Sequence, residues 1–198
     1  MGLRALASDL GCLIRRDGVR ETVRRLGSGF RRGELLVLVK RLDEIQDIAF
    51  QAQLHVEELS PGSLPALAEL NRRRCDTRAT ARFAADLEHG HRGFVASIDG
   101  RLVGYYWWAD GNHSHLRRLG VELQDGDVYG FDFFLAAEHR GDGRAVAFLH
   151  AIESALHERG YTRLWGYVRG DNRPARWLYS MRGYEVVKHV DLKPGQMR

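Results

Sequence analysis

The chain has 198 residues, of which 44% are hydrophobic, and its formal net charge at pH 7 is +4. This length fits one compact domain with an appendage and is too short for two ordinary domains, while the apolar content excludes a disordered chain. The mild basic excess favours an anionic ligand, whether a polyphosphate cofactor, nucleic acid or lipid headgroups.

The cysteines and the apolar runs indicate the cellular environment of the chain. Cys12 and Cys75 lie far apart and match neither a disulfide framework nor a zinc-ligand spacing. We therefore expect two ordinary small side chains, no metal, and a reducing, cytoplasmic environment. No run is long and apolar enough to span a bilayer, and Arg4 and Asp9 interrupt the N-terminal apolar stretch, which argues against a signal peptide.

Residues 1–50 are expected to form a helical extension followed by one strand. Apolar residues recur at helical spacing on both sides of Gly18, with arginines on the other face, and residues 34–40 are typical of a strand. Three roles stay open for the arginine-rich residues 1–32: a cap docked on the sheet, an interfacial helix on anionic lipid, or a contact with nucleic acid or an acidic partner. We favour the cap, with residues 51–198 forming the main domain.

The first part of the main domain predicts a strand, two helices and a hairpin. Alternation over residues 51–57 indicates a half-buried strand, and apolar positions after Ser60 and after Asp76 or Thr77 indicate two amphipathic helices. Asp99-Gly100 then favours a two-residue turn between two strands. The strands of this hairpin are Gly93–Ile98 and Leu102–Trp108, the second ending in the aromatic run Tyr105–Trp108, which we expect to pack in the core.

The rest of the domain alternates strands and helices. Val128–Leu135 is the most strand-like run of the chain, and its apolar character predicts a central strand buried on both faces. The elements predicted after it are an amphipathic helix ending at Gly160, a strand at Leu164–Val168, a short helix from Pro174 to Gly183, and a last strand at Tyr184–Val190. This order predicts an α/β or α+β domain around a mixed sheet.

The sharpest local feature is the turn Arg140-Gly141-Asp142-Gly143-Arg144-Ala145, between a buried strand and a helix. Its glycines allow a tight turn and close approach of a ligand, free N–H groups at the helix start suit phosphate, and two arginines can add charge-assisted hydrogen bonds. The alternative is a plain strand-to-helix turn with solvated arginines. The segment matches neither a Walker loop nor the dinucleotide-binding fingerprint.

Two groups of residues resemble the signatures of the GNAT N-acyltransferase superfamily. Arg140, Gly143 and Ala145 match its pyrophosphate loop, Arg/Gln-x-x-Gly-x-Gly/Ala, in order and spacing. The residues similar to its second signature are Asn172, Ala175, Leu178, Tyr179, Gly183 and Tyr184. The resemblance covers roughly residues 51–192.

The resemblance implies a mixed, mostly antiparallel sheet flanked by helices, with splayed central strands at Val128–Leu135 and Leu164–Val168. It also implies acetyl-CoA as co-substrate, with the pantetheine arm pairing with the first of these strands. The residues implied to bind the cofactor are Phe133, Phe134, Leu135, Arg140, Gly141, Asp142, Gly143, Arg144, Ala145 and Asn172. For Asn172 the alternative is an ordinary loop residue or a cap before Pro174.

Two residues are candidates for the proton transfers of an acyl transfer to an amine. Tyr179 looks like the general acid that protonates the leaving thiolate; the alternative is a tyrosine packed on the sheet with its hydroxyl in water. Asp132, a carboxylate inside an apolar strand, is the candidate base, and its alternative is to anchor a neighbouring loop. The stretch from Asp132 resembles small-amine acetyltransferases, with Phe131 where a glutamate commonly stands.

We therefore expect an N-acetyltransferase that moves an acetyl (acyl) group from acetyl-CoA to a primary amine of a small molecule or a protein. The alternative is a non-catalytic, CoA-binding regulatory module on the same fold. Nucleic acid is not expected as a partner, whereas a membrane contact through residues 1–32 and a homodimer stay open. The resemblance fixes the donor far better than the acceptor or the acyl length.

Overall fold

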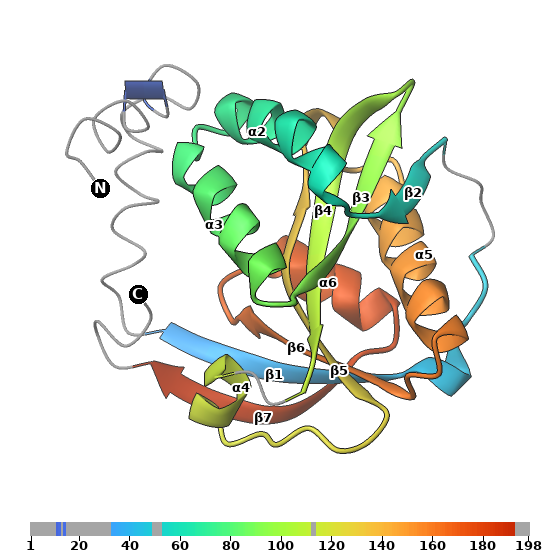
Figure 1. Cartoon of the computed structure of the whole chain (residues 1–198). Coiled ribbons are helices and arrows are strands. Elements are labelled where there is room, and N and C mark those ends of the chain that lie inside the picture. Colours follow the sequence, from blue (N-terminus) through green and yellow to red (C-terminus); the bar gives the residue numbers. More distant parts are fainter. Residues whose placement is uncertain (1–10, 13, 15–32, 49–52, 112–113, 193–198) are drawn as a thin grey trace.

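The computed structural model describes residues 11–12, 14, 33–48, 53–111 and 114–192 (Figure 1). The strands are β1 (Gly33–Arg41), β2 (His55–Glu58), β3 (Arg92–Ile98), β4 (Arg101–Asp110), β5 (Asp127–Leu135), β6 (Arg163–Arg169) and β7 (Glu185–Leu192). The helices whose two ends lie in the described residues are α2 (Leu64–Arg73), α3 (Thr77–Glu88), α4 (Ser114–Arg118), α5 (Arg144–Glu158) and α6 (Arg173–Met181). Short 3-10 turns lie at Leu42–Glu44, Pro61–Ser63 and Ala137–His139.

Within the described residues the strands form one sheet in the order β2-β3-β4-β5-β6-β1-β7. Neighbouring strands are antiparallel except β5 and β6, which confirms the predicted mixed, mostly antiparallel sheet. β1 comes first in the chain yet lies between β6 and β7, with Val37 opposite Tyr167 on one side and Lys188 on the other. Part of the first 50 residues therefore completes this sheet, and the domain boundary after residue 50 stays a prediction.

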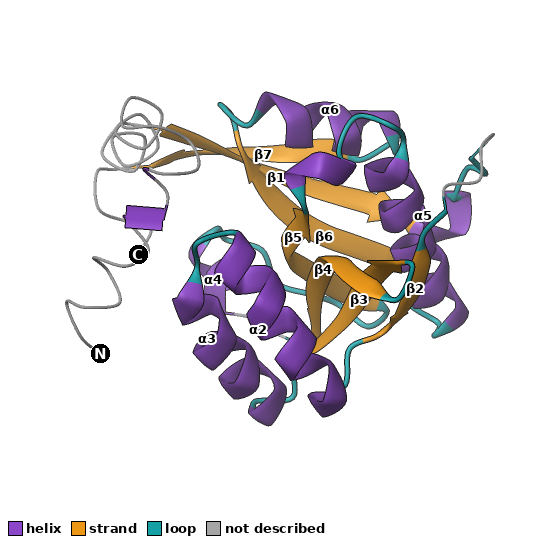
Figure 2. Cartoon of the chain, turned by 90° about the horizontal axis from the view of Figure 1, so that it is seen from above, coloured by secondary structure: helices purple, strands orange, loops and turns teal. Residues whose placement is uncertain are grey.

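Helices cover both faces of the sheet. Figure 2 shows α5 and α6 on one face, and α2, α3 and α4 on the other. Apolar residues of α5 and α6 pack on one face with Tyr106 and Trp108, whereas α2 and α3 pack on the opposite face with Tyr105 and Trp107. The aromatic run of β4 thus alternates between two cores, as its period of two requires, and its predicted packing role is confirmed.

Local capping explains where the helices begin. The Asp76 carboxylate accepts a hydrogen bond from the Ala79 amide at 3.2 Å and so caps α3. Gly143, with φ of 85°, precedes α5 in a left-handed conformation that favours glycine. The helices predicted after residue 60 and the hairpin are confirmed, while β2 is shorter than the strand predicted over residues 51–57, of which residues 51–52 lie outside the described residues.

The cysteine prediction is wrong, because Cys12 and Cys75 form a disulfide across a sequence separation of 63. Separation in sequence does not limit which residues a fold brings together. Gly11, Cys12 and Ile14 are helical, and the other predicted helical residues before 33 lie outside the described residues. No helix in the described part of the chain is long and apolar enough to cross a membrane, and the cytoplasmic location stays a prediction.

Candidate active site

The central strands β5 and β6 separate and leave a cleft between them. Their parallel pairing joins Asp127–Tyr129 to Arg163–Trp165, although β5 continues to Leu135 and β6 to Arg169. The space between the two strands forms a cavity of about 550 Å³. Its lining residues from β5 and β6 are Gly130, Phe131, Asp132, Phe133, Leu135, Tyr167, Val168 and Arg169, joined by Arg140, Gly141, Ala145, Asn172, Pro174, Ala175, Trp177, Leu178 and Tyr179. The predicted splay is therefore confirmed, and the half-buried residues Phe131–Phe134 correct the expectation that β5 is buried on both faces throughout.

A β-bulge in β5 shapes the middle of the cleft. The register with β4 shifts between Tyr105, which lies opposite Phe134, and Trp107, which lies opposite Phe131. Asp132 sits in the extra segment with a φ of 51°, a left-handed conformation that aspartate tolerates better than most residues. The bulge breaks the strict alternation of the strand, so Phe131 and Phe134, three positions apart, both pack toward α2 and α3, while Phe133 packs toward α5.

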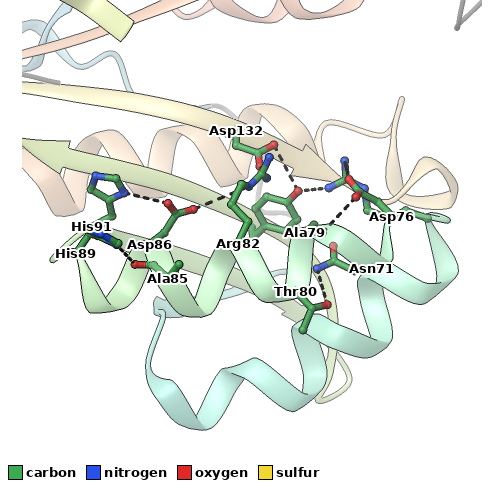
Figure 3. A network of polar contacts seen from close by, with 12 residues as sticks. Asn71, Asp76, Ala79, Thr80, Arg82, Ala85, Asp86, His89, His91 and Asp132 are labelled. Carbon is green, nitrogen blue, oxygen red and sulfur yellow. Dashed lines mark hydrogen bonds and ion pairs between the residues drawn. The ribbon is translucent and has the colours of Figure 1, made fainter. Parts of the chain in front are cut away.

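The carboxylate of Asp132 is held by polar groups from α3 and β4. Figure 3 shows Asp132 directed toward Arg82, which in turn lies beside Asp86. The Arg82 guanidinium contacts the Asp132 carboxylate, and the Tyr105 hydroxyl donates to its Oδ1 at 3.4 Å. Burial raises the pKa of Asp132, and the positive charges of Arg82 and Arg74 oppose that rise. Asp132 therefore both lines the cleft and anchors a neighbouring element, which is helix α3 rather than a loop.

Tyr179 reaches the cleft from α6 on the other face of the sheet. Its ring packs edge-on against Tyr184, with 4.9 Å between the ring centres. Burial raises its pKa, and the carboxylate of Glu153 beneath it raises the pKa further. Glu153 is itself paired with Arg182, whose Nη2 lies 2.5 Å from Oε2, in a buried ion pair that ties α5 to the end of α6.

The predicted phosphate-binding turn connects β5 to α5 at one end of the cleft. Gly141 and Gly143 have φ of 94° and 85°, which requires glycine-like freedom at both positions. The Asp142 carboxylate contacts the Arg144 guanidinium and accepts from the Arg144 amide at 3.3 Å. Arg140 donates from Nε to the Leu135 carbonyl at 2.7 Å, which braces the end of β5.

The cleft gathers most, but not all, of the predicted site residues. Asp132, Tyr179 and the predicted cofactor-binding residues Phe133, Leu135, Arg140, Gly141, Ala145 and Asn172 line it. Phe134, Asp142, Gly143 and Arg144 do not. Asn172 also accepts from the Ala175 amide at 3.3 Å, so its alternative role as the cap of α6 is present as well.

Sequence reasoning missed several residues at this site. Trp177 lines the cleft although 62% of its surface is exposed, and Tyr167 and Arg169 line it from β6. Nothing in the sequence indicates that Trp177 is exposed, because its exposure depends on how α6 packs on the sheet. No sequence pattern links Arg82 to Asp132, since that contact depends on how α3 packs on the sheet.

In the described part of the chain, the candidate site has no cluster of metal-ligating side chains. Among the described residues there is no group of three or more histidine, cysteine, aspartate and glutamate side chains placed to hold a metal ion. The charged groups of the cleft are instead one carboxylate, Asp132, and the two guanidinium groups of Arg140 and Arg169. Their chemistry suits proton transfer and the binding of anions.

Known proteins share both the sequence pattern and the fold. Residues 51–184 match the family model described as the acetyltransferase (GNAT) family. Two curated relatives, the mycothiol acetyltransferases of Corynebacterium jeikeium (strain K411) and Rhodococcus jostii (strain RHA1), are each 36% identical, over 92 and 101 residues respectively. These stretches cover 46% and 50% of this chain but 25% and 30% of the relatives, so the chain matches less than a third of their length.

A solved structure gives the same fold. The GNAT family N-acetyltransferase YhbS from Escherichia coli, in complex with CoA, superposes with a TM-score of 0.50 at 23% sequence identity. The superposition covers 71% of this chain and 73% of that protein. At this identity the likeness supports the architecture of the sheet and helices.

Proposed function

Because the chain belongs to the acetyltransferase (GNAT) family, we propose that it transfers an acetyl group from acetyl-CoA to a primary amine in the cleft between β5 and β6. One observation carries this proposal: Asp132 and Tyr179 come from opposite faces of the sheet and line the same cavity. A base for the amine and an acid for the departing sulfur are thus available to one pair of reacting groups.

The proton of the amine has to be removed before attack. An alkylamine is mostly protonated at neutral pH, and an ammonium nitrogen has no lone pair to offer. We assign this deprotonation to Asp132, whose pKa is raised by burial and which is therefore a stronger base than an exposed aspartate. The freed nitrogen then bonds to the thioester carbonyl carbon and forms a tetrahedral adduct.

Collapse of that adduct breaks the carbon–sulfur bond. The sulfur gains a proton and the nitrogen, which is cationic in the adduct, loses one, so that the products are an amide and a thiol. We assign the protonation of the sulfur to Tyr179. Burial and Glu153 raise the pKa of this phenol, so it carries its proton at every physiological pH. Because a thiol has a reference pKa of about 8.5, transfer from such a phenol is uphill, and it has to occur as the bond breaks rather than afterwards.

The turn after β5 supports binding of the donor. The first turn of α5 presents backbone N–H groups without intrahelical acceptors, and Gly141 allows a diphosphate to approach them closely. Arg140 at the same end of the cleft adds positive charge. Asp142 already accepts from the Arg144 amide, so a diphosphate has to compete with this carboxylate.

The test is release of CoA thiol from acetyl-CoA across a panel of amines. The panel includes small alkylamines, arylalkylamines, diamines and a lysine peptide. We expect thiol release that depends on an amine, and its loss in Asp132→Asn. Tight binding of CoA with no turnover on any acceptor would instead favour the alternative, a non-catalytic CoA-binding module.

A further inference from the structure

The lining of the cleft divides between the two faces of the sheet. Val168, Leu178 and Tyr179 belong to the apolar core beneath α5 and α6. Phe131 and Tyr167 instead pack with the cores beneath α2, α3 and α4. Side chains that pack on both faces of the sheet therefore line the cleft, and we call the part formed by Phe131 and Tyr167 on the α2–α4 side its mouth.

Aromatic rings form the wall of that mouth. The rings of Phe131 and Tyr167 both stack on Tyr129, with centre distances of 5.3 Å and 6.4 Å and interplanar angles of 21° in each case. Tyr129 is fully buried between them, whereas the two outer rings are half-buried and line the cavity. His91 further packs edge-on against Phe131 at 5.4 Å. The two cavity-facing rings are thus fixed in orientation before any ligand arrives.

The charges of the cleft favour a single positive group in the ligand. Asp132 is the one carboxylate among the residues that line the cavity, and it already shares its charge with Arg82. The other charged residues of the lining are the cations Arg140 and Arg169, of which Arg169 is paired with Asp171 at 3.0 Å. A second ammonium group along the cleft would therefore meet no second carboxylate in the lining, and burying a cation without a partner is costly.

We propose that this mouth binds the acceptor, and that the acceptor is a monocationic primary amine with an aromatic or bulky apolar body, held by Phe131 and Tyr167 with its ammonium group at Asp132. Aromatic faces attract both apolar rings and cations, so the two rings suit the body of such a ligand and the carbon next to its nitrogen. The inference rests on the proposed function and names its substrate class.

Three commercial amines test the proposal: 2-phenylethylamine, n-butylamine and 1,4-diaminobutane. Binding of each is measured by calorimetry on the full chain saturated with CoA, and acetyl transfer is measured separately as thiol release from acetyl-CoA. We expect 2-phenylethylamine to bind at least tenfold more tightly than either other amine and to show the highest kcat/KM. Equal affinities, or preference for the diamine, would overturn the proposal.

Substitutions of the two aromatic residues test whether they cause the preference for 2-phenylethylamine. Phe131→Leu and Tyr167→Leu are expected to weaken 2-phenylethylamine binding five- to tenfold and n-butylamine binding by about twofold or less. Trp165→Leu is the matched control, since Trp165 lies on β6 two residues from Tyr167, packs in the same core and does not line the cavity. An equal loss in the control, or no loss in the two variants, would contradict the assignment.

The two arms separate this inference from the proposed function. Preferential binding of 2-phenylethylamine that depends on Phe131, without any thiol release, would support the acceptor mouth and count against catalysis. Thiol release that is equally fast in the wild type and in the Phe131 and Tyr167 variants would support catalysis and overturn the proposed class of acceptor.

Discussion

The guanidinium of Arg82 on α3 contacts the carboxylate of Asp132 at the bulge of β5, fifty positions further along the chain. Arg82 also lies 3.9 Å from Asp86, which pairs with His91 at 3.3 Å (Figure 3). This chain of charges joins α3 to the strand that lines the cleft. The position of α3 and the ionisation of Asp132 are therefore coupled, and mutations at Asp132 have consequences for stability as well as for turnover.

Asp132→Asn is expected to change the pH dependence of stability. Burial raises the pKa of Asp132 above its ordinary value of 3.8, so folding disfavours the ionised form. A carboxyl with a raised folded pKa contributes its stabilisation below the unfolded pKa and loses it as the pH rises through the folded pKa. The wild type should thus lose stability relative to the variant as the pH rises above about 4 and through the range over which the buried carboxyl ionises.

Urea denaturation of both proteins across this pH range measures the difference. A stability difference that stays constant with pH would show that the Arg82 contact offsets burial, and one that moves in favour of the wild type as the pH rises would show that it outweighs burial.

Gly130→Ala is expected to disturb the cleft. An added Cβ at Gly130 would overlap the hydroxyl of Tyr106 and lie 2.5 Å from its Cζ, so this buried ring has to move. Overpacking of this kind costs about 1–3 kcal/mol, and we expect weaker CoA binding as well. Gly166→Ala on the neighbouring strand is the matched control, because its Cβ would meet its nearest atom, the Gly130 carbonyl oxygen, at an ordinary 3.5 Å. Similar unfolding free energies for the two variants would refute this account of Gly130.

The Glu153–Arg182 pair beneath Tyr179 should be costly to break. Its side chains are 0% and 4% exposed, and Arg182 also donates to the Gln46 carbonyl at 3.1 Å. Arg182→Met leaves the Glu153 carboxylate buried without its partner, which we expect to cost about 3–5 kcal/mol in the free energy of unfolding. The double variant Glu153→Leu/Arg182→Met should recover most of that loss. Chemical denaturation of the wild type and both variants measures these free energies of unfolding. A value for Arg182→Met within about 1 kcal/mol of wild type would contradict the prediction.

Reduction of the Cys12–Cys75 disulfide should destabilise the chain. The bond closes a loop across 63 positions, for which the chain-entropy model gives roughly 4 kcal/mol. The denaturation midpoint is therefore expected to fall when a reductant is added. A Cys12→Ser/Cys75→Ser variant should be equally stable with and without reductant. A wild-type denaturation midpoint that does not change when the reductant is added would show that the disulfide contributes no such stabilisation.

Local patterns were enough to predict most elements of this fold. Helix caps, glycine turns and the Asp99-Gly100 hairpin signal depend on neighbouring residues, so their outcome is readable from short windows. The turn predicted to bind phosphate is readable for the same reason, because its glycines, arginines and helix start are contiguous from Arg140 to Ala145.

Features that depend on long-range pairing were not readable. Nothing in Gly33–Arg41 indicates that this strand lies between β6 and β7, since its partners are more than 120 positions away. The disulfide of Cys12 is of the same kind. The bulge at Asp132 was hidden as well, because an apolar run with one acidic residue looks like a regular strand until its register with β4 is known.

The most direct test of the central claim is the turnover of Tyr179→Phe, with CoA affinity measured on the same samples. If Tyr179 protonates the departing sulfur, kcat should fall by about 10²–10⁴-fold while the dissociation constant for CoA stays within about twofold of wild type. An unchanged kcat with intact CoA binding would remove Tyr179 from the chemistry of the cleft.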